Sequence, residues 1–350
     1  MSKPPSRIGY AITATALSRS LLLLRQNGPG LLLVCAIAAL AIGILKLLGG
    51  RGFSPMILAT LFGLLLANTA GTPVWARAGA AFAARRALRL GIVLLGFQIT
   101  ITDILGIGVT GILILIVVVT ATFLVTAWLG QLLGLDRSLS WLIAMGTAIC
   151  GVAAIAATSA TIRSNSKDTA YAVACITLFG SVAMFTYPLL PQLLNLSDQQ
   201  YGFWIGNSVH EVAQVVAAGF QHNTAAGEIA TITKLGRVLL LAPMITAIGV
   251  IAARREKVGA GTMQALPVVP WFVAGFIAAV LLNTWVLASV ETRHLIGLVS
   301  TFLLAMALGA IGLDIELRRL VAAGLRPLLL GLLASLFVAA ISLVAIRFWI

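Results

Sequence analysis

Four polar side chains recur at helical spacing in an otherwise apolar segment. Asn207, His210, Glu211 and Gln214 stand at positions i, i+3, i+4 and i+7, so on one α-helix they would share a face. Ionisable groups inside a membrane are costly, and they usually line a cavity or pair with each other. Because histidine changes charge near neutral pH, we expect His210 and Glu211 to couple protons, with Asn207, His210 and Gln214 as substrate ligands. A hydrogen-bond cluster that only locks helices together is the alternative.

The same segment also resembles half of a zinc motif. His210-Glu211 begins the pattern His-Glu-x-x-His, but the second histidine is replaced by Gln214, which is a poor zinc ligand. A zinc protease site needs three protein ligands, and the other histidines, His222 and His294, lie in predicted loops. We therefore expect no metal, no cofactor and no enzymatic activity, with H⁺ or Na⁺ as the coupling ion.

Glycines interrupt two further apolar segments, Gly146–Gly151 and Gly309–Gly312. Glycine can unwind a helix at small steric cost, and the free N–H groups of two half-helix N-termini would form an anion site. Close helix packing is the alternative use of such glycines. Asp314, just after the second interruption, would cap a half-helix or carry the coupling ion. The substrate ligands expected at the two interruptions are Gly146, Thr147, Cys150, Gly151, Gly309 and Gly312.

Composition places these residues in a membrane. Hydrophobic residues make up 60% of the 350 residues and charged residues only 9%, against about a quarter charged in soluble domains. A helix needs about 20 apolar residues to cross the hydrocarbon. Counting the apolar segments predicts about eleven transmembrane helices. The uncharged windows are 26–45, 52–76, 104–135, 138–162, 169–197, 258–290, 295–313 and 327–346, and the interrupted segments are roughly 88–106, 200–221 and 230–253.

An internal repeat organises these helices. Residues 89–95 match residues 234–240 at five of seven positions, and Ala144-Met145 matches Ala305-Met306 with a glycine six residues after each methionine. A weaker third pair, residues 67–69 and 206–208, is collinear with them. Five spans in each half would invert one half relative to the other, as in many secondary transporters. We expect an all-α protein whose interrupted helices cross. Its parts would be a cytoplasmic segment 1–28, an extra transmembrane helix 29–50, repeat 1 at 51–195 and repeat 2 at 196–350.

The chain has a net charge of +13, and its charged residues lie between the apolar stretches. We interpret it as loop charge that orients the chain, and we expect no nucleic-acid partner. The Lys and Arg bias predicts a cytoplasmic N-terminus and a C-terminus outside. Arg163 and Lys167 fall on the wrong side of that rule, where they could instead attract an anion. The expected partners are the lipid bilayer and a small anion, and the sequence is compatible with a homo-oligomer.

Four segments resemble the YeiH family, bacterial inner-membrane proteins that carry a sulfate-exporter label. They are 88–96, 148–157, 206–219 and 305–314, and the His-Glu-Val-Ala-Gln stretch from His210 to Gln214 is the most specific. The resemblance covers nearly the whole chain after residue 28. It implies a relation to the folds of bile-acid/sodium symporters and sodium/proton antiporters, and export of a sulfur oxyanion or an organic sulfonate.

Together these observations predict a secondary transporter of a small anion in the bacterial inner membrane. It would work by alternating access coupled to protons or sodium. An anion channel is one alternative, although a channel usually takes its lining from symmetric subunits. A membrane-embedded sensor or scaffold without transport is the other.

Overall fold

The computed structural model describes residues 7–47, 54–256, 270–286, 289–315 and 325–346, with the side chains of 7–25, 253–256 and 290 excepted. Within these ranges the chain is almost wholly helical and contains no strand. Six helical segments are long and apolar enough to cross a membrane: Gln26–Leu47, Gly108–Leu132, Ser166–Leu189, Thr224–Ala252, Glu291–Asp314 and Leu325–Ile346. The expectation of an all-α polytopic membrane protein is confirmed.

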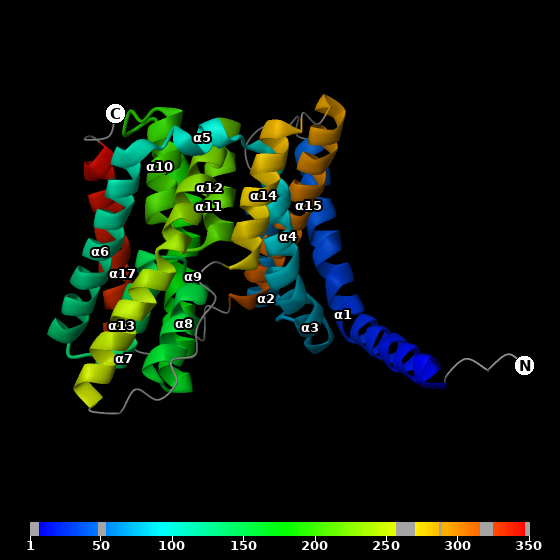
Figure 1. Cartoon of the computed structure of the whole chain (residues 1–350), viewed down its shortest axis with the longest axis horizontal. Coiled ribbons are helices and arrows are strands. Elements are labelled where there is room, and N and C mark those ends of the chain that lie inside the picture. The colour runs from blue at the N-terminus through cyan, green and yellow to red at the C-terminus, as the bar shows by residue number, and fades with distance from the viewer. Residues whose placement is uncertain (1–6, 48–53, 257–269, 287–288, 316–324, 347–350) are drawn as a thin grey trace, which may run out of the picture.

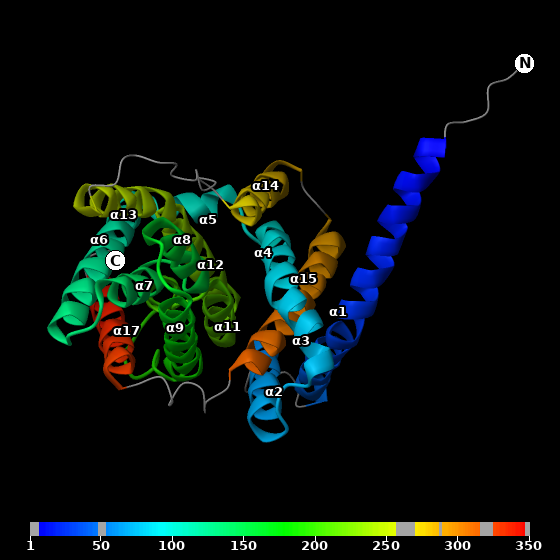
Figure 2. The same ribbon diagram turned by 90° about the horizontal axis from the view of Figure 1, so that it is seen from below.

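The helices form two bundles that lie side by side (Figures 1 and 2). The first bundle combines the N-terminal helices with two helices from late in the chain. Its members are α1 (Arg7–Leu47), α2 (Pro55–Thr69), α3 (Val74–Phe82), α4 (Leu88–Leu95), α14 (Trp271–Trp285) and α15 (Val290–Asp314). A π-helical turn, Ala83–Ala87, joins α3 to α4, and a 3-10 turn, Gly96–Gln98, follows α4.

The second bundle holds the middle of the chain and the C-terminal helix. The short helix α5 (Ile101–Leu105) leads into it from the first bundle. Its members are α6 (Gly108–Leu132), α7 (Arg137–Ala148), α8 (Val152–Ile162), α9 (Ser166–Thr186), α10 (Asp198–Ser208), α11 (Val212–His222), α12 (Thr224–Leu239), α13 (Leu241–Glu256) and α17 (Leu325–Ile346). A 3-10 turn, Tyr187–Leu189, extends α9.

Helix α15 runs without interruption through Gly309 and Gly312, so the expected break there is wrong. These glycines instead let α15 approach α2. A methyl group placed on Gly63 of α2 would lie 2.2 Å from the carbonyl oxygen of Gly309, and one on Gly312 would lie 2.4 Å from that of Thr60. Small residues allow such close backbone contact between membrane helices. Gly309 and Gly312 therefore serve helix packing.

The first interruption is present, but its geometry differs from the expected one. Helix α7 ends at Ala148 and α8 begins at Val152. Gly151 has φ +71°, and its N–H donates to the carbonyl of Gly146 at 3.0 Å. The chain then turns back so that α8 packs against α7, and a methyl group on Gly146 would lie 2.9 Å from Cδ1 of Ile155. Residues 137–162 thus form a re-entrant hairpin, here the first hairpin, and both its ends lie at one end of the molecule (Figure 1).

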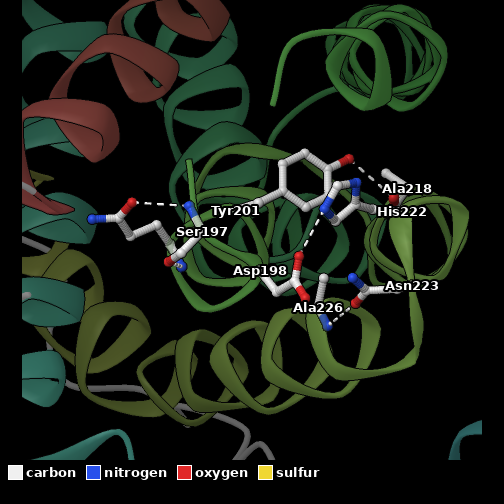
Figure 3. Close-up of polar contacts among 8 residues, drawn as sticks. Ser197, Asp198, Tyr201, Ala218, His222, Asn223 and Ala226 are labelled. Carbon is white, nitrogen blue, oxygen red and sulfur yellow. Dashed lines mark hydrogen bonds and ion pairs between the residues drawn. The ribbon is translucent and has the colours of Figure 1, made fainter. Parts of the chain in front are cut away.

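The expected span at roughly 200–221 is instead a second re-entrant hairpin, residues 198–222. Helix α10 ends at Ser208 and α11 begins at Val212. Figure 3 shows its two ends held together: His222 Nε2 lies 2.9 Å from Asp198 Oδ1, and the Tyr201 hydroxyl donates to the carbonyl of Ala218 at 3.0 Å. This hairpin opens toward the end of the molecule opposite to the open end of the first (Figure 1).

Two of the expected transmembrane spans, 138–162 and 200–221, are therefore hairpins. Each enters and leaves at the same end of the molecule, so neither crosses it as one span (Figure 1). The expected crossing of two interrupted helices, 138–162 and 295–313, is not found, because the second of them is the continuous helix α15. The loop with Arg163 and Lys167 consequently lies at the same end as the start of α7 (Figure 1). That placement removes the conflict between these two residues and the Lys and Arg bias of the other loops.

Candidate functional site

The turns of the two hairpins meet at one side chain of α12. The amine Nζ of Lys234 donates to the carbonyl of Ile149 at 2.7 Å and to that of Val209 at 2.8 Å. One carbonyl belongs to the turn of each hairpin, and Lys234 has no exposed surface. Lys234 therefore ties together two turns that lie 60 residues apart in the sequence.

Arg237, one helical turn further along α12, binds the carbonyls just before these turns. Its guanidinium donates to Thr147 and Ala148 at the end of α7, and to Gly206 and Asn207 at the end of α10. The Nη2 distances are 2.7 Å to Thr147 and 2.6 Å to Ala148. These bonds engage all three nitrogens of a side chain that has five N–H donors. We call Lys234, Arg237 and the two turns, 149–151 and 209–211, the tip site.

The ends of α7 and α10 explain why buried cations are needed here. The last carbonyls of a helix have no partner within it and carry partial negative charge. Leaving such a group buried and unpaired costs about 1–3 kcal/mol, and inside a membrane no water can replace the partner. Lys234 and Arg237 satisfy the C-terminal carbonyls of both α7 and α10 and oppose their dipoles.

A carboxylate, that of Glu211, lies where the second helix of each hairpin begins, at the N-termini of α8 and α11. Glu211 precedes α11 and forms a capping box with Gln214, whose Oε1 accepts from the Glu211 N–H at 3.1 Å. A methyl group on Gly151, which precedes α8, would lie 2.5 Å from Cγ of Glu211. The chain thus places its own negative charge at the half-helix N-termini where the sequence predicted a bound anion.

Helix α9 holds this carboxylate in place. The hydroxyl of Thr177 donates to Glu211 Oε1 at 3.0 Å, and Gln214 Nε2 lies 3.2 Å from both the Thr177 carbonyl and the Ser181 hydroxyl. A methyl group on Gly180 would lie 2.0 Å from Gln214 Oε1. Gln214 therefore acts as a bracket between the second hairpin and α9.

His210 and Glu211 point toward different helices. His210 Nε2 lies 3.1 Å from the hydroxyl of Ser335 on α17, and that hydroxyl donates to the carbonyl of Gly331 at 2.7 Å. The expected stripe on one helix face is wrong, because the helix is interrupted between Ser208 and Val212. Asn207 ends the first half-helix and Gln214 lies in the second.

Several buried polar atoms near the tip site have no partner among the described residues. They are the hydroxyls of Thr147 and Thr233, Oδ1 of Asn207 and Nδ1 of His210. Thr233 faces the second hairpin, since a methyl group on Gly206 would lie 2.5 Å from its Cβ. Buried polar groups are nearly always hydrogen-bonded, so this gathering indicates a place for a polar ligand or water.

The structure brings together most, though not all, of the predicted site residues. Gly146, Thr147, Cys150 and Gly151 lie in or beside the first turn, and Cys150 is buried. Gly309 and Gly312 lie on α15 against α2, and Asp314 is an exposed residue at the end of α15. Among the described residues, no group of three His, Cys, Asp or Glu side chains is arranged to hold a metal ion.

Neither Lys234 nor Arg237 was among the site residues that the sequence predicted. Both lie on α12, which belongs to the membrane-spanning segment Thr224–Ala252. Lys234 is 10 residues from the start of that segment, or about 15 Å at the rise of an α-helix, so its amine cannot reach the near interface. The available signal was the i, i+3 spacing of two basic residues deep inside one apolar segment.

The fold and the tip site define a polytopic membrane protein in which two re-entrant hairpins enclose buried charges. A family model described as "Conserved hypothetical protein 698" matches residues 29–331. The chain belongs to this family, known also as UPF0324.

Curated relatives resemble the chain over most of its length. The UPF0324 inner membrane protein YeiH of Escherichia coli K12 is 39% identical over 313 residues, covering 87% of this chain and 89% of the relative. The same-named protein of Salmonella typhimurium is 38% identical over 313 residues, with the same coverage. A UPF0324 membrane protein of Pseudomonas putida is 33% identical over 342 residues, covering 96% of this chain and 95% of the relative. The names of the first two support an inner-membrane location, and that of the third a membrane location.

Proposed function

We propose that this protein is a secondary transporter, and not an enzyme, that binds a small anion at the tip site. The observation that carries this proposal is the meeting of two oppositely directed re-entrant hairpins at Lys234 and Arg237. Interrupted helices that meet near mid-membrane are a recurring way to build a transporter site. Buried ionisable groups within a membrane are by default functional.

The charges of the tip site favour an anion. Counted at their usual protonation states, Lys234 and Arg237 carry two positive charges and Glu211 carries one negative charge, so one positive charge is in excess among these three buried or partly buried residues. An ammonium group has three donors, of which two bind Ile149 and Val209. The third donor of Lys234, together with the hydroxyls of Thr147 and Thr233, provides ligands for a singly charged oxyanion such as bisulfite or an organic sulfonate.

The arrangement of the hairpins supports alternating access. Because the hairpins open toward opposite ends, movement at the first would expose the tip site to one side and movement at the second to the other. The clasp of Asp198, Tyr201 and His222 in Figure 3 holds one of these hairpins closed. We infer that each hairpin acts as the gate for its own side of the membrane.

The internal repeat remains part of this proposal. The repeat matches α4 to α12, and it also matches α7 of the first hairpin to α15 and α10 of the second hairpin to α2. The two hairpins meet at the tip site, while their matched helices α2 and α15 pack directly through Gly63 and Gly312. On this view the two hairpins form the binding site, and their matched helices α2 and α15 form part of the scaffold.

Binding to the purified full-length protein tests the function. Sulfite, sulfate, a short alkyl sulfonate and acetate would be titrated by isothermal calorimetry at fixed ionic strength. We expect a singly charged oxyanion to bind, and Lys234→Met to abolish that binding because it removes the free donor and the excess charge. Arg326→Met is the matched control, since Arg326 is exposed at the start of α17. No binding of any anion, or equal binding by Lys234→Met, would contradict the proposal.

A further inference from the structure

The carbonyls at the tip site are those that would coordinate a coupling cation. In transporters with interrupted helices, unwound carbonyls and half-helix C-termini bind Na⁺. Here Ile149 and Val209 contribute one such carbonyl from each hairpin, and both accept hydrogen bonds from Lys234. The position that a mobile cation would take between the hairpins is occupied by a cation of the chain itself.

We propose that Lys234 is a tethered substitute for a coupling sodium ion, so that this protein binds its anion independently of Na⁺. The proposal rests on the function proposed above, but it also predicts a cation effect that is measurable without any substrate. An ammonium group carries the same single charge as Na⁺ and is fixed to α12. It therefore joins the two hairpins permanently, whereas a free ion would join them only when bound.

The neighbouring groups leave little for a sodium ion to bind. Arg237 engages the carbonyls of Thr147 and Ala148 on one hairpin and those of Gly206 and Asn207 on the other. A sodium ion at the turns would also face two buried positive charges, and like charges within a few ångströms in a water-poor site repel strongly.

Of the two carboxylates expected to carry the coupling ion, one is already hydrogen-bonded and the other lies at a helix end. Glu211 belongs to the tip site, where it already accepts a hydrogen bond from Thr177 and caps α11. Asp314 lies exposed at the end of α15.

The cation effect can be measured by thermal unfolding of the purified full-length protein in detergent. The midpoint would be recorded in NaCl, KCl and choline chloride at equal ionic strength. We expect the same midpoint for the wild type in all three salts. Lys234→Ala should unfold at a lower temperature in choline, and Na⁺ should restore part of that loss because it can enter the vacated space between Ile149 and Val209.

Two variants serve as controls. Lys234→Arg keeps a tethered charge and should show no preference among the salts. Arg89→Ala removes a basic residue that the sequence matches to Lys234 in the internal repeat, but Arg89 lies on α4 in the other bundle. It should likewise show no sodium effect. If Lys234→Ala does not fold, Lys234→Gln replaces it, because glutamine can still donate to one turn carbonyl.

A second measurement compares anion affinity in sodium and in choline. We expect equal affinities for the wild type. A wild-type midpoint that rises specifically with Na⁺, or an affinity more than about tenfold tighter in Na⁺, would overturn the tethered-cation proposal, as would a Lys234→Ala protein that ignores all three cations. If no anion binds in either salt, the proposed function fails while the unfolding series still decides the role of Lys234.

Discussion

The two basic residues of α12 make more contacts with the turns of the hairpins than His210, the residue on which the sequence-based prediction centred. Lys234 and Arg237 both reach the carbonyls of two hairpins, whereas His210 bonds to Ser335 on α17. Fixed positive charge is thus present at the tip site without protonation of His210. The role left for the imidazole is to add a donor through Nδ1, which has no partner among the described residues.

His210 gives a prediction at the residue scale. If a protonated His210 adds a charged hydrogen bond to the anion, affinity should weaken as pH rises and the proton is lost. His210→Gln should flatten this pH dependence and lower affinity at acidic pH by about tenfold or more, the value of one charged hydrogen bond. Calorimetric titration between acidic and mildly alkaline pH measures both effects.

Ser335→Ala is the control for that experiment. It keeps the imidazole but removes the hydroxyl that lies 3.1 Å from Nε2, so a dependence on pH should persist. If His210→Gln shows the same pH profile as the wild type, His210 only anchors the second hairpin to α17, and protons are not coupled through it.

At the scale of elements, Gly151 is the residue that reverses the first hairpin. Its φ of +71° and ψ of −126° form a backbone conformation that glycine adopts readily and that residues with a Cβ rarely adopt. A methyl group there would also lie 2.5 Å from Cγ of Glu211. The backbone and the adjoining carboxylate both therefore require glycine at this turn.

We expect Gly151→Ala to lower the thermal unfolding midpoint and to abolish anion binding, because the methyl group displaces Glu211. Gly108→Ala separates the two causes. Gly108 also has a positive φ, +64°, but a methyl group there meets nothing within 4 Å. It should show only the backbone cost, about 1–2 kcal/mol, with anion affinity unchanged. Equal effects of the two substitutions would show that the contact with Glu211 is unimportant.

At the scale of the whole molecule, the two hairpins change which loops lie on the same side of the membrane. The loop with Arg163 and Lys167 lies at the same end as the start of α7 at Arg137 (Figure 1), and lysine and arginine favour the cytoplasmic side. Removing two crossings from the eleven expected leaves an odd number, so a cytoplasmic N-terminus and an external C-terminus remain our proposal.

Single cysteines and a membrane-impermeant maleimide test this topology in intact cells. Asp136→Cys and Lys167→Cys should both be protected, because both lie on the cytoplasmic side of a re-entrant hairpin. Gln192→Cys, in the loop after α9, should react. All three positions are exposed in the fold, so protection would reflect the membrane. Protection of Asp136→Cys together with reaction of Lys167→Cys would show that 138–162 crosses the membrane and would refute the hairpin.

Composition and periodicity alone established the solvent and the class of this protein. A chain with 60% hydrophobic and 9% charged residues must place most of its length in lipid, where helices satisfy their own backbone. The interruption at Gly146–Gly151 and the polar segment 207–214 were likewise visible, because glycines and buried charges are conspicuous among apolar residues.

Tertiary structure decided what each of these features does. The same glycine pattern unwinds the chain at Gly151 and packs a continuous helix at Gly312, because Glu211 adjoins the first and the backbone of α2 adjoins the second. The turn between α10 and α11, residues 209–211, contains no glycine. It is stable because Lys234 and Arg237, distant in the sequence, satisfy the carbonyls that unwinding exposes, and such a partnership between separate helices leaves no local signal for periodicity to detect.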